Sequence, residues 1–409
     1  MKKDKKKIRI LFVAMSESIH TAKWISLLSD YEYEKALFPS NTPVLHEMLS
    51  LQKVRWKDPH PILKIVCKLF GPKLYNKLVS FRRIINKIFP SSNKEIKLYR
   101  MVKKFKPDII HSMETQHAGY LVLSTKNKLF KNKKFPIWVH TNWGSDIYLF
   151  GRLDGHREKI SQILSECDYY TCESKRDISL ALEMGYKGHV FEPFPNACGF
   201  DIQSIQKTRE QVRTSDRNLI LVKGYQGWAG RGLFALRALA LASGVLNDYE
   251  IIVYSADDND AIKISVEILR QDFGMNIRVL ENNIPNEEML RFFAKARIYL
   301  GLSISDGIST SLLEAMAMGA FPIQSGTSTA SEWIINNEGG FIVPAEDAEK
   351  VAECVKTAVQ NDILVDTAAQ ENWLMILNNA NSISIKQKIN ETYRTITSNF
   401  INDTVKRTR

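Results

Sequence analysis

Short apolar runs alternate with amphipathic helical stretches through this 409-residue chain, and this alternation restricts the possible folds more than any other feature. The runs at 8–14, 108–111 and 137–140 are typical of buried strands, and helical periodicity is present at 20–28 and 160–166. Strands connected through helices pair in parallel within one sheet. The first half of the chain is therefore predicted to be an α/β unit with a parallel sheet.

The same pattern begins again near residue 218 and passes through a second complete cycle. The strands expected there are 218–222, 251–254, 277–280, 298–301, 321–323 and 341–343, and the helices are 232–243, 264–273, 286–295 and 311–318. A unit of this kind is doubly wound by itself. We therefore predict two Rossmann-like domains.

The domain limits follow from where the pattern changes. The polar stretch 201–217 looks like the connection, so the domains are predicted at 1–205 and 206–378. The tail at 379–409 has apolar residues at helical spacing, and we expect it to pack back on the first domain.

Composition fits a globular protein of a reducing compartment. The five cysteines include no C-x-x-C pair, which argues against a disulfide framework and a structural zinc site. The basic residues at 2–7 precede only a strand-length apolar run, so we expect no secretory signal. No apolar stretch approaches the roughly 20 residues that span a bilayer. We therefore expect a cytoplasmic protein.

One segment concentrates the positive charge of the chain. Residues 51–107 contain sixteen Lys and Arg against two acids, whereas the whole chain has a net charge of +11. Apolar residues recur at helical spacing through this segment, as on a surface that docks on anionic lipid. The alternative is a solvated basic face. The segment lacks a recognisable nucleic-acid motif, so we expect no nucleic-acid partner.

The residues from Asp306 to Glu314 follow the expected strand at 298–301, where α/β folds bind ligands. Asp306 precedes a run of small residues, and Glu314 is expected in the first turn of the next helix. Carboxylates there can accept hydrogen bonds from sugar hydroxyls, and the helix start can bind phosphate. Equally, Ser311 and Glu314 fit a capping box that only closes the helix. The small residues assigned to this site are Gly307, Ser309, Thr310 and Ser311.

The stretch 299–332 resembles the donor-binding signature of the retaining GT-B glycosyltransferases of family 4. It has two acids separated by seven residues, then Ala-Met-Ala, Gly, Pro-Ile and Ser-Glu, and Gly-Gly-Phe-Ile-Val-Pro follows at 339–344. The resemblance implies a GT-B fold, with two Rossmann-like domains facing each other across a cleft. It also implies that Asp306 contacts the donor sugar and that Glu314 contacts the ribose. Asp306 stands where the family usually has Glu.

The resemblance implies further site residues. Lys223 and Arg231 stand near the place of the basic pair that grips the diphosphate, at a longer spacing than usual, and two solvated cations on a Gly-rich loop are the alternative. In the first domain, His111, His117 and Asp146 follow strands, and His117 is favoured over His111 for contact with the reacting sugar.

The resemblance implies a retaining hexosyltransferase that uses a UDP- or GDP-linked sugar, with no other cofactor and no metal. The acceptor is expected to be lipid-linked or a glycan, in bacterial surface polysaccharide biosynthesis, with peripheral attachment to the inner face of the membrane. A GT-B sugar-nucleotide epimerase and a catalytically inactive membrane-docking homologue remain as alternatives. Asp258-Asn259-Asp260 fits the D-x-D metal motif of the other main glycosyltransferase fold, but the repeated sheet pattern argues against that fold.

Overall fold

The structure, a computed structural model, describes residues 7–42, 44–56, 94–131, 133–209, 211–256, 259–281 and 284–407. The larger part of the basic segment 51–107 therefore lies outside the described residues. The chain forms two compact units. The first comprises Met1–Glu173, Asp177–Cys198 and Lys386–Arg409, and the second comprises Ser174–Arg176 and Gly199–Ile385.

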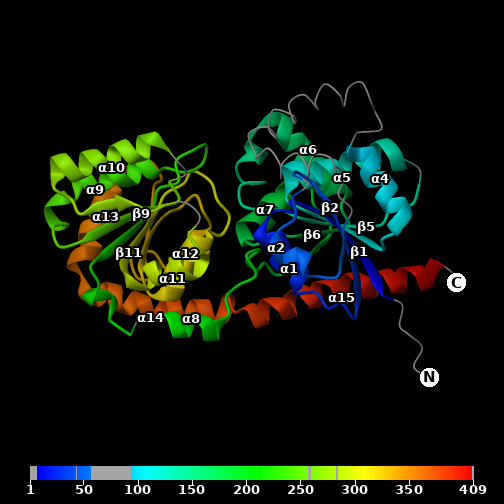
Figure 1. The fold of residues 1–409 in the computed structure, drawn as a ribbon. Helices are drawn as coiled ribbons and strands as arrows, with labels where there is room; N and C mark the ends of the chain where they lie inside the picture. The colour runs from blue at the N-terminus through cyan, green and yellow to red at the C-terminus, as the bar shows by residue number, and fades with distance from the viewer. Residues whose placement is uncertain are drawn as a thin grey trace, which may run out of the picture. The chain divides into compact units, whose positions relative to one another are not determined.

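The first unit is built on a parallel seven-stranded sheet in the order β3-β2-β1-β4-β5-β6-β7. Figure 1 labels its strands β1, β2, β5 and β6. Its strands are β1 (Ile8–Ala14), β2 (Tyr33–Pro39), β3 (Val54–Trp56), β4 (Ile109–Met113), β5 (Ile137–Thr141), β6 (Tyr169–Thr171) and β7 (His189–Val190). The central strands β1 and β4 are mostly apolar and almost entirely buried, as expected for a parallel sheet covered by helices. The strand order reverses between them, which places a switch point at their carboxyl ends.

Helices connect these strands. They are α1 (Ile19–Ser26), α2 (Glu47–Ser50), α4 (Lys94–Phe105), η2 (Thr115–Gly119), α5 (Tyr120–Thr125), η3 (Lys126–Phe130), η4 (Phe150–Arg152), α6 (Asp154–Glu166) and α7 (Lys175–Glu183). The apolar core of this unit includes Leu121 and Val122 of α5, Ile160 and Ile163 of α6 and the buried Trp138 of β5.

The second unit has a parallel six-stranded sheet in the order β10-β9-β8-β11-β12-β13. Its strands are β8 (Leu219–Lys223), β9 (Glu250–Tyr254), β10 (Ile277–Val279), β11 (Ala296–Gly301), β12 (Phe321–Ser325) and β13 (Phe341–Val343). The helices are α8 (Ile202–Thr208), η5 (Thr214–Asp216), α9 (Gly232–Leu241), η6 (Ser243–Val245), α10 (Asp260–Phe273), α11 (Asn286–Lys295), α12 (Thr310–Met318), η7 (Ala330–Glu332), α13 (Ala348–Gln360) and α14 (Asp362–Asn379). Here the strand order reverses between β8 and β11.

The last helix, α15 (Ser382–Arg407), contributes most of its length to the first unit. Tyr393 is buried there, and its hydroxyl lies 2.6 Å from Nδ1 of His111 in β4. The indole Nε1 of Trp24 donates to the same hydroxyl at 3.3 Å. The end of the described chain is thus part of the core of the unit that begins it.

The predicted α/β class is confirmed, because both units are parallel sheets flanked by helices. In the part of the chain that the structure describes, no helix combines the length and the apolar character needed to cross a membrane.

Candidate functional site

The switch point of the second unit is framed by two loops that pair with each other. The loop after β8 meets the loop after β11 through hydrogen bonds from Arg231 N to Leu302 O (3.0 Å) and from Ile304 N to Ala229 O (2.8 Å). The first of these loops ends at α9, whose first residue is Gly232. A Cβ at Gly232 would lie 2.7 Å from the carbonyl oxygen of Gly224, so the close approach of helix and loop requires glycine.

Lys223 is the last residue of β8 and is half-buried at this switch point. Burial acts to lower the pKa of its ammonium group, but Tyr299, Asp306 and Glu314 outweigh burial and raise the pKa above its ordinary value. The cation is therefore firmly protonated at neutral pH. The two acids of the sequence motif both act on it, so three of the residues singled out from the sequence share one electrostatic environment.

Asp306 and the small residues after it form the loop that leads into α12. Oδ1 of Asp306 accepts a hydrogen bond from the N–H of Gly307 at 2.9 Å, and the carbonyl oxygen of Gly307 accepts one from Thr329 N at 3.1 Å. Ser309 is the N-cap residue of α12, but its side chain makes no capping bond. The first turn, which begins with Thr310 and Ser311, is thus not capped by a side chain, as a helix start that binds an anion requires.

Two buried hydroxyls beside this loop also lack an internal partner. The side-chain oxygens of Ser303 and Thr329 are buried, and neither bonds to another of the described residues. Buried hydroxyls are normally satisfied, and an exception calls for water or a ligand. Both lie next to the backbone segments that frame the switch point, which is where a ligand is expected.

The predicted position of Glu314 in the first turn of its helix is wrong. The helix begins at Thr310, so Glu314 is its fifth residue, and no acid lies in the first turn. The capping box is therefore wrong, because Glu314 is beyond the N3 position that such a box uses. The Glu314 side chain instead accepts a 2.7 Å hydrogen bond from Nδ2 of Asn286, the first residue of α11.

Arg231 lies at the other end of the loop after β8 and has a different environment. Its Nε contacts Oε1 of Glu346 at 2.5 Å, and its Nη1 donates to the carbonyl oxygen of Gly230 at 2.9 Å. Lys223 and Arg231 thus lie at opposite ends of one loop. Of these two cations, Arg231 forms an ion pair with another described residue and Lys223 does not. To contact a diphosphate, the Arg231 guanidinium would have to share or leave Glu346.

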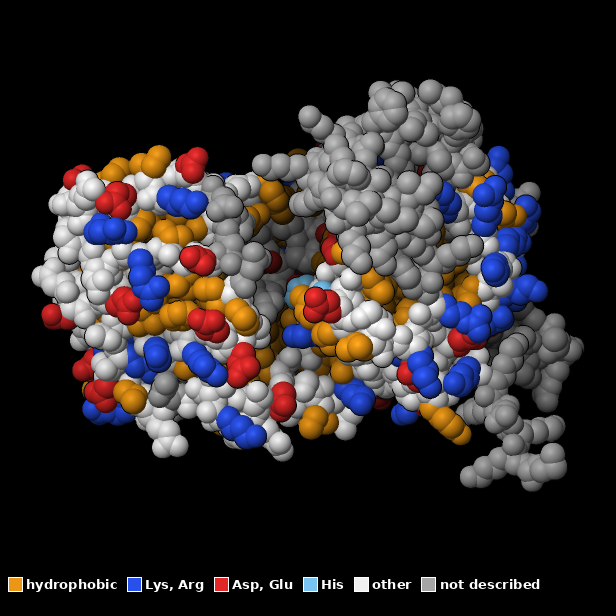
Figure 2. Space-filling model, viewed as in Figure 1, with side chains coloured by type: hydrophobic (Ala, Val, Ile, Leu, Met, Phe, Trp, Pro, Cys, Tyr) orange, Lys and Arg blue, Asp and Glu red, His pale blue; other side chains and the backbone are white. Residues whose placement is uncertain are grey.

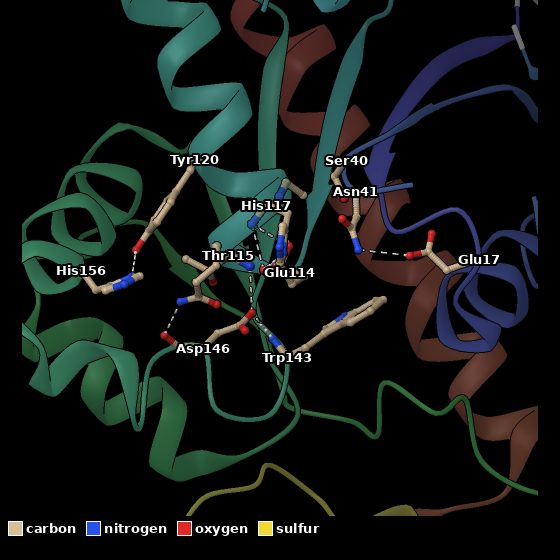
Figure 3. Close-up of polar contacts among 12 residues, drawn as sticks. Glu17, Ser40, Asn41, Glu114, Thr115, His117, Tyr120, Trp143, Asp146 and His156 are labelled. Atoms are coloured by element: carbon tan, nitrogen blue, oxygen red, sulfur yellow. Dashed lines mark hydrogen bonds and ion pairs between the residues drawn. The ribbon is translucent and has the colours of Figure 1, made fainter. Parts of the chain in front are cut away.

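The switch point of the first unit carries Glu114 and His117 (Figure 3). Glu114 follows β4, is buried, and has φ +82°, a positive value that is uncommon for a residue with a side chain. Its carboxylate accepts hydrogen bonds from the backbone N–H of His117 and of Ala118, at 2.9 and 3.0 Å. Oε1 also lies 3.1 Å from Nδ1 of His117, whose side chain is half-exposed.

Asp146 joins two loops at the same end of this sheet. Its Oδ2 accepts hydrogen bonds from the N–H of Thr115 at 2.8 Å and from the N–H of Trp143 at 2.7 Å. Burial and then the nearby Glu114 raise the pKa of the Asp146 carboxyl well above its usual range, although these two bonds lower it. The geometry gives Asp146 the task of holding the loops after β4 and β5 together.

His111 lies within β4 and is buried, so it does not emerge at the strand end as His117 does. Its Nδ1 contacts the Tyr393 hydroxyl and its Nε2 contacts Oγ1 of Thr141, each at 2.6 Å. Burial and then the nearby His140 lower the pKa of His111 to about 3. With both nitrogens bonded within the protein, this neutral ring joins β4 to β5 and α15.

Two family models match the chain. The model "Glycosyl transferases group 1" matches residues 233–361, and "Glycosyl transferase 4-like" matches residues 92–174. The chain is a GT-B glycosyltransferase. The group 1 match includes Asp306 and Glu314, and the 4-like match includes Glu114 and His117, whereas Lys223 and Arg231 lie outside the matched residues.

Solved structures of the same fold resemble this glycosyltransferase along almost its whole length. Anabaena Alr3699/HepE, in complex with UDP-glucose, has a TM-score of 0.67 at 14% identity, covering 95% of this chain and 100% of that chain. Sucrose-phosphate synthase from Thermosynechococcus elongatus has a TM-score of 0.67 at 14% identity, covering 96% and 100%. A glycosyltransferase from Rickettsia africae has a TM-score of 0.63 at 14% identity, covering 97% and 100%. The comparison with curated proteins gives no match.

The residues of the glycosyltransferase that touch predicted site residues but were not predicted from the sequence include Glu114 and Asn286. Glu114 stands three residues before His117, and that spacing could have indicated a contact within one helical turn. Asn286 is 28 residues from Glu314, and no local pattern joins them. Among the described residues no group of three or more His, Cys, Asp or Glu side chains could hold a metal ion.

Proposed function

We propose that this glycosyltransferase moves a sugar, with retention of anomeric configuration, from a nucleoside-diphosphate sugar to a lipid-linked or glycan acceptor. The observation that carries the proposal is the cluster of Lys223, Asp306 and Glu314 at the switch point of the second unit. A firmly protonated lysine beside two carboxylates suits a ligand that is both anionic and rich in hydroxyl groups.

The donor is proposed to bind in the second unit. The Lys223 ammonium would offset the negative charge that develops on the departing diphosphate. The start of α12, with Gly307, Ser309, Thr310 and Ser311, would supply N–H and hydroxyl groups to the same phosphates. By family resemblance, Asp306 contacts the donor sugar and Glu314 the ribose. Arg231 joins as a second cation when it exchanges Glu346 for phosphate.

The nucleotide is proposed to be UDP or GDP. Alr3699/HepE was solved in complex with UDP-glucose, which favours testing uridine donors first. Thermal shift with a panel of nucleotide sugars identifies the base and the sugar, because a ligand that binds only the folded state raises the midpoint of unfolding. Incubation with the best donor and no acceptor should give no new nucleotide sugar. An epimerase would make one.

In the first unit, His117 is proposed to contact the reacting sugar. Its half-exposed ring at the carboxyl end of β4 supports this choice over His111, whose ring is buried with both nitrogens bonded. Asp146 contributes indirectly by fixing the loops beside His117.

Retention and metal independence are proposed from the family resemblance and from the Lys223 cation. NMR of the product should show the anomeric configuration of the donor sugar, and turnover should persist in excess EDTA. An inverted product would overturn the first point, and complete loss of activity in EDTA that Mg²⁺ restores would overturn the second.

Peripheral attachment to anionic lipid at the inner face of the membrane is proposed from the basic segment 51–107, in keeping with surface polysaccharide biosynthesis on a lipid carrier. Within its described part, α4 carries Lys97, Arg100, Lys103 and Lys104. Figure 2 shows Lys and Arg side chains gathered on the part of the first unit that carries α4. Each basic residue near an anionic surface contributes about 1 kcal/mol, which salt screens.

Co-sedimentation with vesicles tests this attachment. Binding should require anionic lipid, decrease with added salt, and decrease when Lys64, Lys68, Arg82 and Arg83 are neutralised together. Equal recovery with neutral and anionic vesicles would leave the segment as a solvated face and favour a soluble acceptor.

A further inference from the structure

The backbone at Glu114 adopts a conformation that its residue type does not favour. The φ angle of +82° is one that glycine adopts freely and that L side chains rarely adopt. Strained residues of this kind persist where the surrounding structure over-determines them, and they cluster at functional sites. The reason for a glutamate here must therefore lie in what its side chain does.

The Glu114 carboxylate is fully engaged with the turn that follows it. Both oxygens accept a hydrogen bond from the N–H of His117 at 2.9 Å, and Oε2 accepts a second from Ala118 at 3.0 Å. These bonds fix the carboxylate relative to the start of η2. The carboxylate is therefore a rigid anchor beside the imidazole ring that projects from the same turn.

A further bond of the carboxylate reaches the imidazole ring itself. Nδ1 of His117 lies 3.1 Å from Oε1 of Glu114, and a carboxylate can only accept, so Nδ1 carries the proton. No described residue is bonded to Nε2. Nδ1 of His117 is thus held as a hydrogen-bond donor. Nε2 is the nitrogen that gains or loses a proton, and it is the one available to a substrate.

We propose that Glu114 is a positioning residue of the glycosyltransferase, which holds His117 in the Nδ1–H tautomer and directs Nε2 at a hydroxyl group of the bound sugar. The proposal rests on the proposed function in assigning His117 to the sugar. In the neutral ring, Nε2 accepts a hydrogen bond from the sugar, and in the charged ring it donates one.

The charges around the ring come from three elements. The bond to Glu114 raises the pKa of His117, partial burial lowers it, and the Glu114 charge raises it further. Lys94 at the start of α4 then lowers it, and Glu17 in the loop after β1 raises it. Glu17 contacts Asn41 instead, whose Nδ2 donates to Oε1 of Glu17 at 3.3 Å (Figure 3). Glu17 therefore acts on His117 through space only.

The difference between Glu114 and Glu17 gives a matched pair of variants. Glu114→Gln removes the charge and replaces one of the two acceptor oxygens by an NH2 donor. Because the backbone N–H groups of His117 and Ala118 both bond to Oε2, the amide oxygen is expected at that position and the NH2 group beside Nδ1. Glu17→Gln removes a charge alone. NMR of imidazole ¹⁵N shifts reads the tautomer and the pKa of His117 directly, in the full chain and without substrate. Neutral His117 should be the Nδ1–H form in the wild type and in Glu17→Gln, and should become mainly the Nε2–H form in Glu114→Gln. The pKa should fall more in Glu114→Gln than in Glu17→Gln.

Kinetics then show whether Glu114 acts through His117. Glu114→Gln and His117→Gln should each lower kcat/KM at least tenfold. The double variant should be little worse than His117→Gln, because the two residues form one unit. Multiplied losses in the double variant would overturn the proposal, as would an Nε2–H tautomer in the wild type.

Glu114→Gly separates the backbone from the side chain. Glycine adopts the positive φ without strain but supplies no carboxylate. This variant should fold and should lose activity as Glu114→Gln does. Wild-type activity in Glu114→Gly would show that the carboxylate has no role beyond the turn and would overturn the proposal. If His117→Gln left transfer unchanged while the NMR result held, the assignment of His117 to the sugar would fail and the tautomer assignment would stand.

Discussion

Asn286 Nδ2 donates a 2.7 Å hydrogen bond to Oε1 of Glu314, which joins the start of α11 to the second turn of α12. Glu314 is 8% exposed, so its carboxylate is desolvated and held in one orientation. This orientation matters if the carboxylate receives a ribose hydroxyl, because a bond to a charged group is strong only when it is aligned.

Glu314→Ala should reduce donor affinity or kcat/KM about tenfold or more, as expected for one lost charge-assisted hydrogen bond. Asn286→Ala should give a smaller loss, because the carboxylate remains but is no longer aligned. Steady-state kinetics with varied donor measure both. Glu287→Ala on the exposed face of α11 is the control and should behave as the wild type. Unchanged kinetics in folded Glu314→Ala would refute the ribose assignment.

Lys223→Met should lower kcat by about 10²-fold or more, because it removes the cation that is proposed to stabilise the leaving diphosphate. Arg231→Met should have a smaller effect, since Glu346 already neutralises the guanidinium in this structure. Single-turnover rates at saturating donor compare the two. Equal losses would show that both cations grip the phosphates in the transition state.

His111 and His140, which are both buried in the first unit, should make the protein acid-sensitive. Burial lowers the pKa of His111 and of His140 to about 3, so both are neutral in the folded protein, whereas in the unfolded chain they titrate near 6.5. The unfolded state therefore binds more protons as the pH falls below 6.5, and stability is lost in that direction. Each histidine contributes a slope of about 1.4 kcal/mol per pH unit.

Urea unfolding between pH 6.5 and 5 measures this slope. In His111→Gln the slope of unfolding free energy against pH should decrease by about 1.4 kcal/mol per pH unit, the contribution of one proton, whatever the loss of stability at pH 7. An unchanged slope would mean that His111 is charged in the folded state.

Tyr393→Phe should destabilise the first unit by about 1–3 kcal/mol, because Nδ1 of His111 and Nε1 of Trp24 would both lose their buried partner. Urea unfolding monitored by tryptophan fluorescence reports the change. Tyr31→Phe is the control, since Tyr31 is 86% exposed. A change below about 0.5 kcal/mol would mean that water replaces the hydroxyl.

Strands of mostly apolar character were predictable from the sequence. The expected strands at 8–14 and 341–343 coincide with β1 and β13, and the expected helix at 286–295 coincides with α11. By contrast, β2 was not predicted, because Lys35 interrupts its apolar pattern. The Lys35 ammonium is satisfied inside the protein by the carbonyl oxygens of Leu28 and Ile25, at 2.8 and 3.2 Å, a solution that exists only in three dimensions.

The residues of the candidate site also differ in whether the sequence could predict their arrangement. Asp306 and Lys223 could be predicted to lie at one edge of the sheet, since each lies at or after the carboxyl end of a parallel strand and the order of strands in this fold is regular. The positive φ of Glu114 could not be predicted, because glycine and asparagine adopt this conformation far more often than glutamate does. The Arg231–Glu346 pair joins residues 115 positions apart, and no local pattern indicates it.

Tyr393 has a consequence for the order in which the chain folds during synthesis. The second unit is essentially one continuous segment, Gly199–Ile385, so it can fold as soon as the ribosome has released that segment. The first unit begins the chain, yet the hydroxyl that satisfies its buried His111 arrives only with residue 393. The ribosome therefore releases most of the first unit early, but the core of this unit stays incomplete until α15 is released. A chain truncated after residue 385 should hold a native second unit and a first unit open to chaperones.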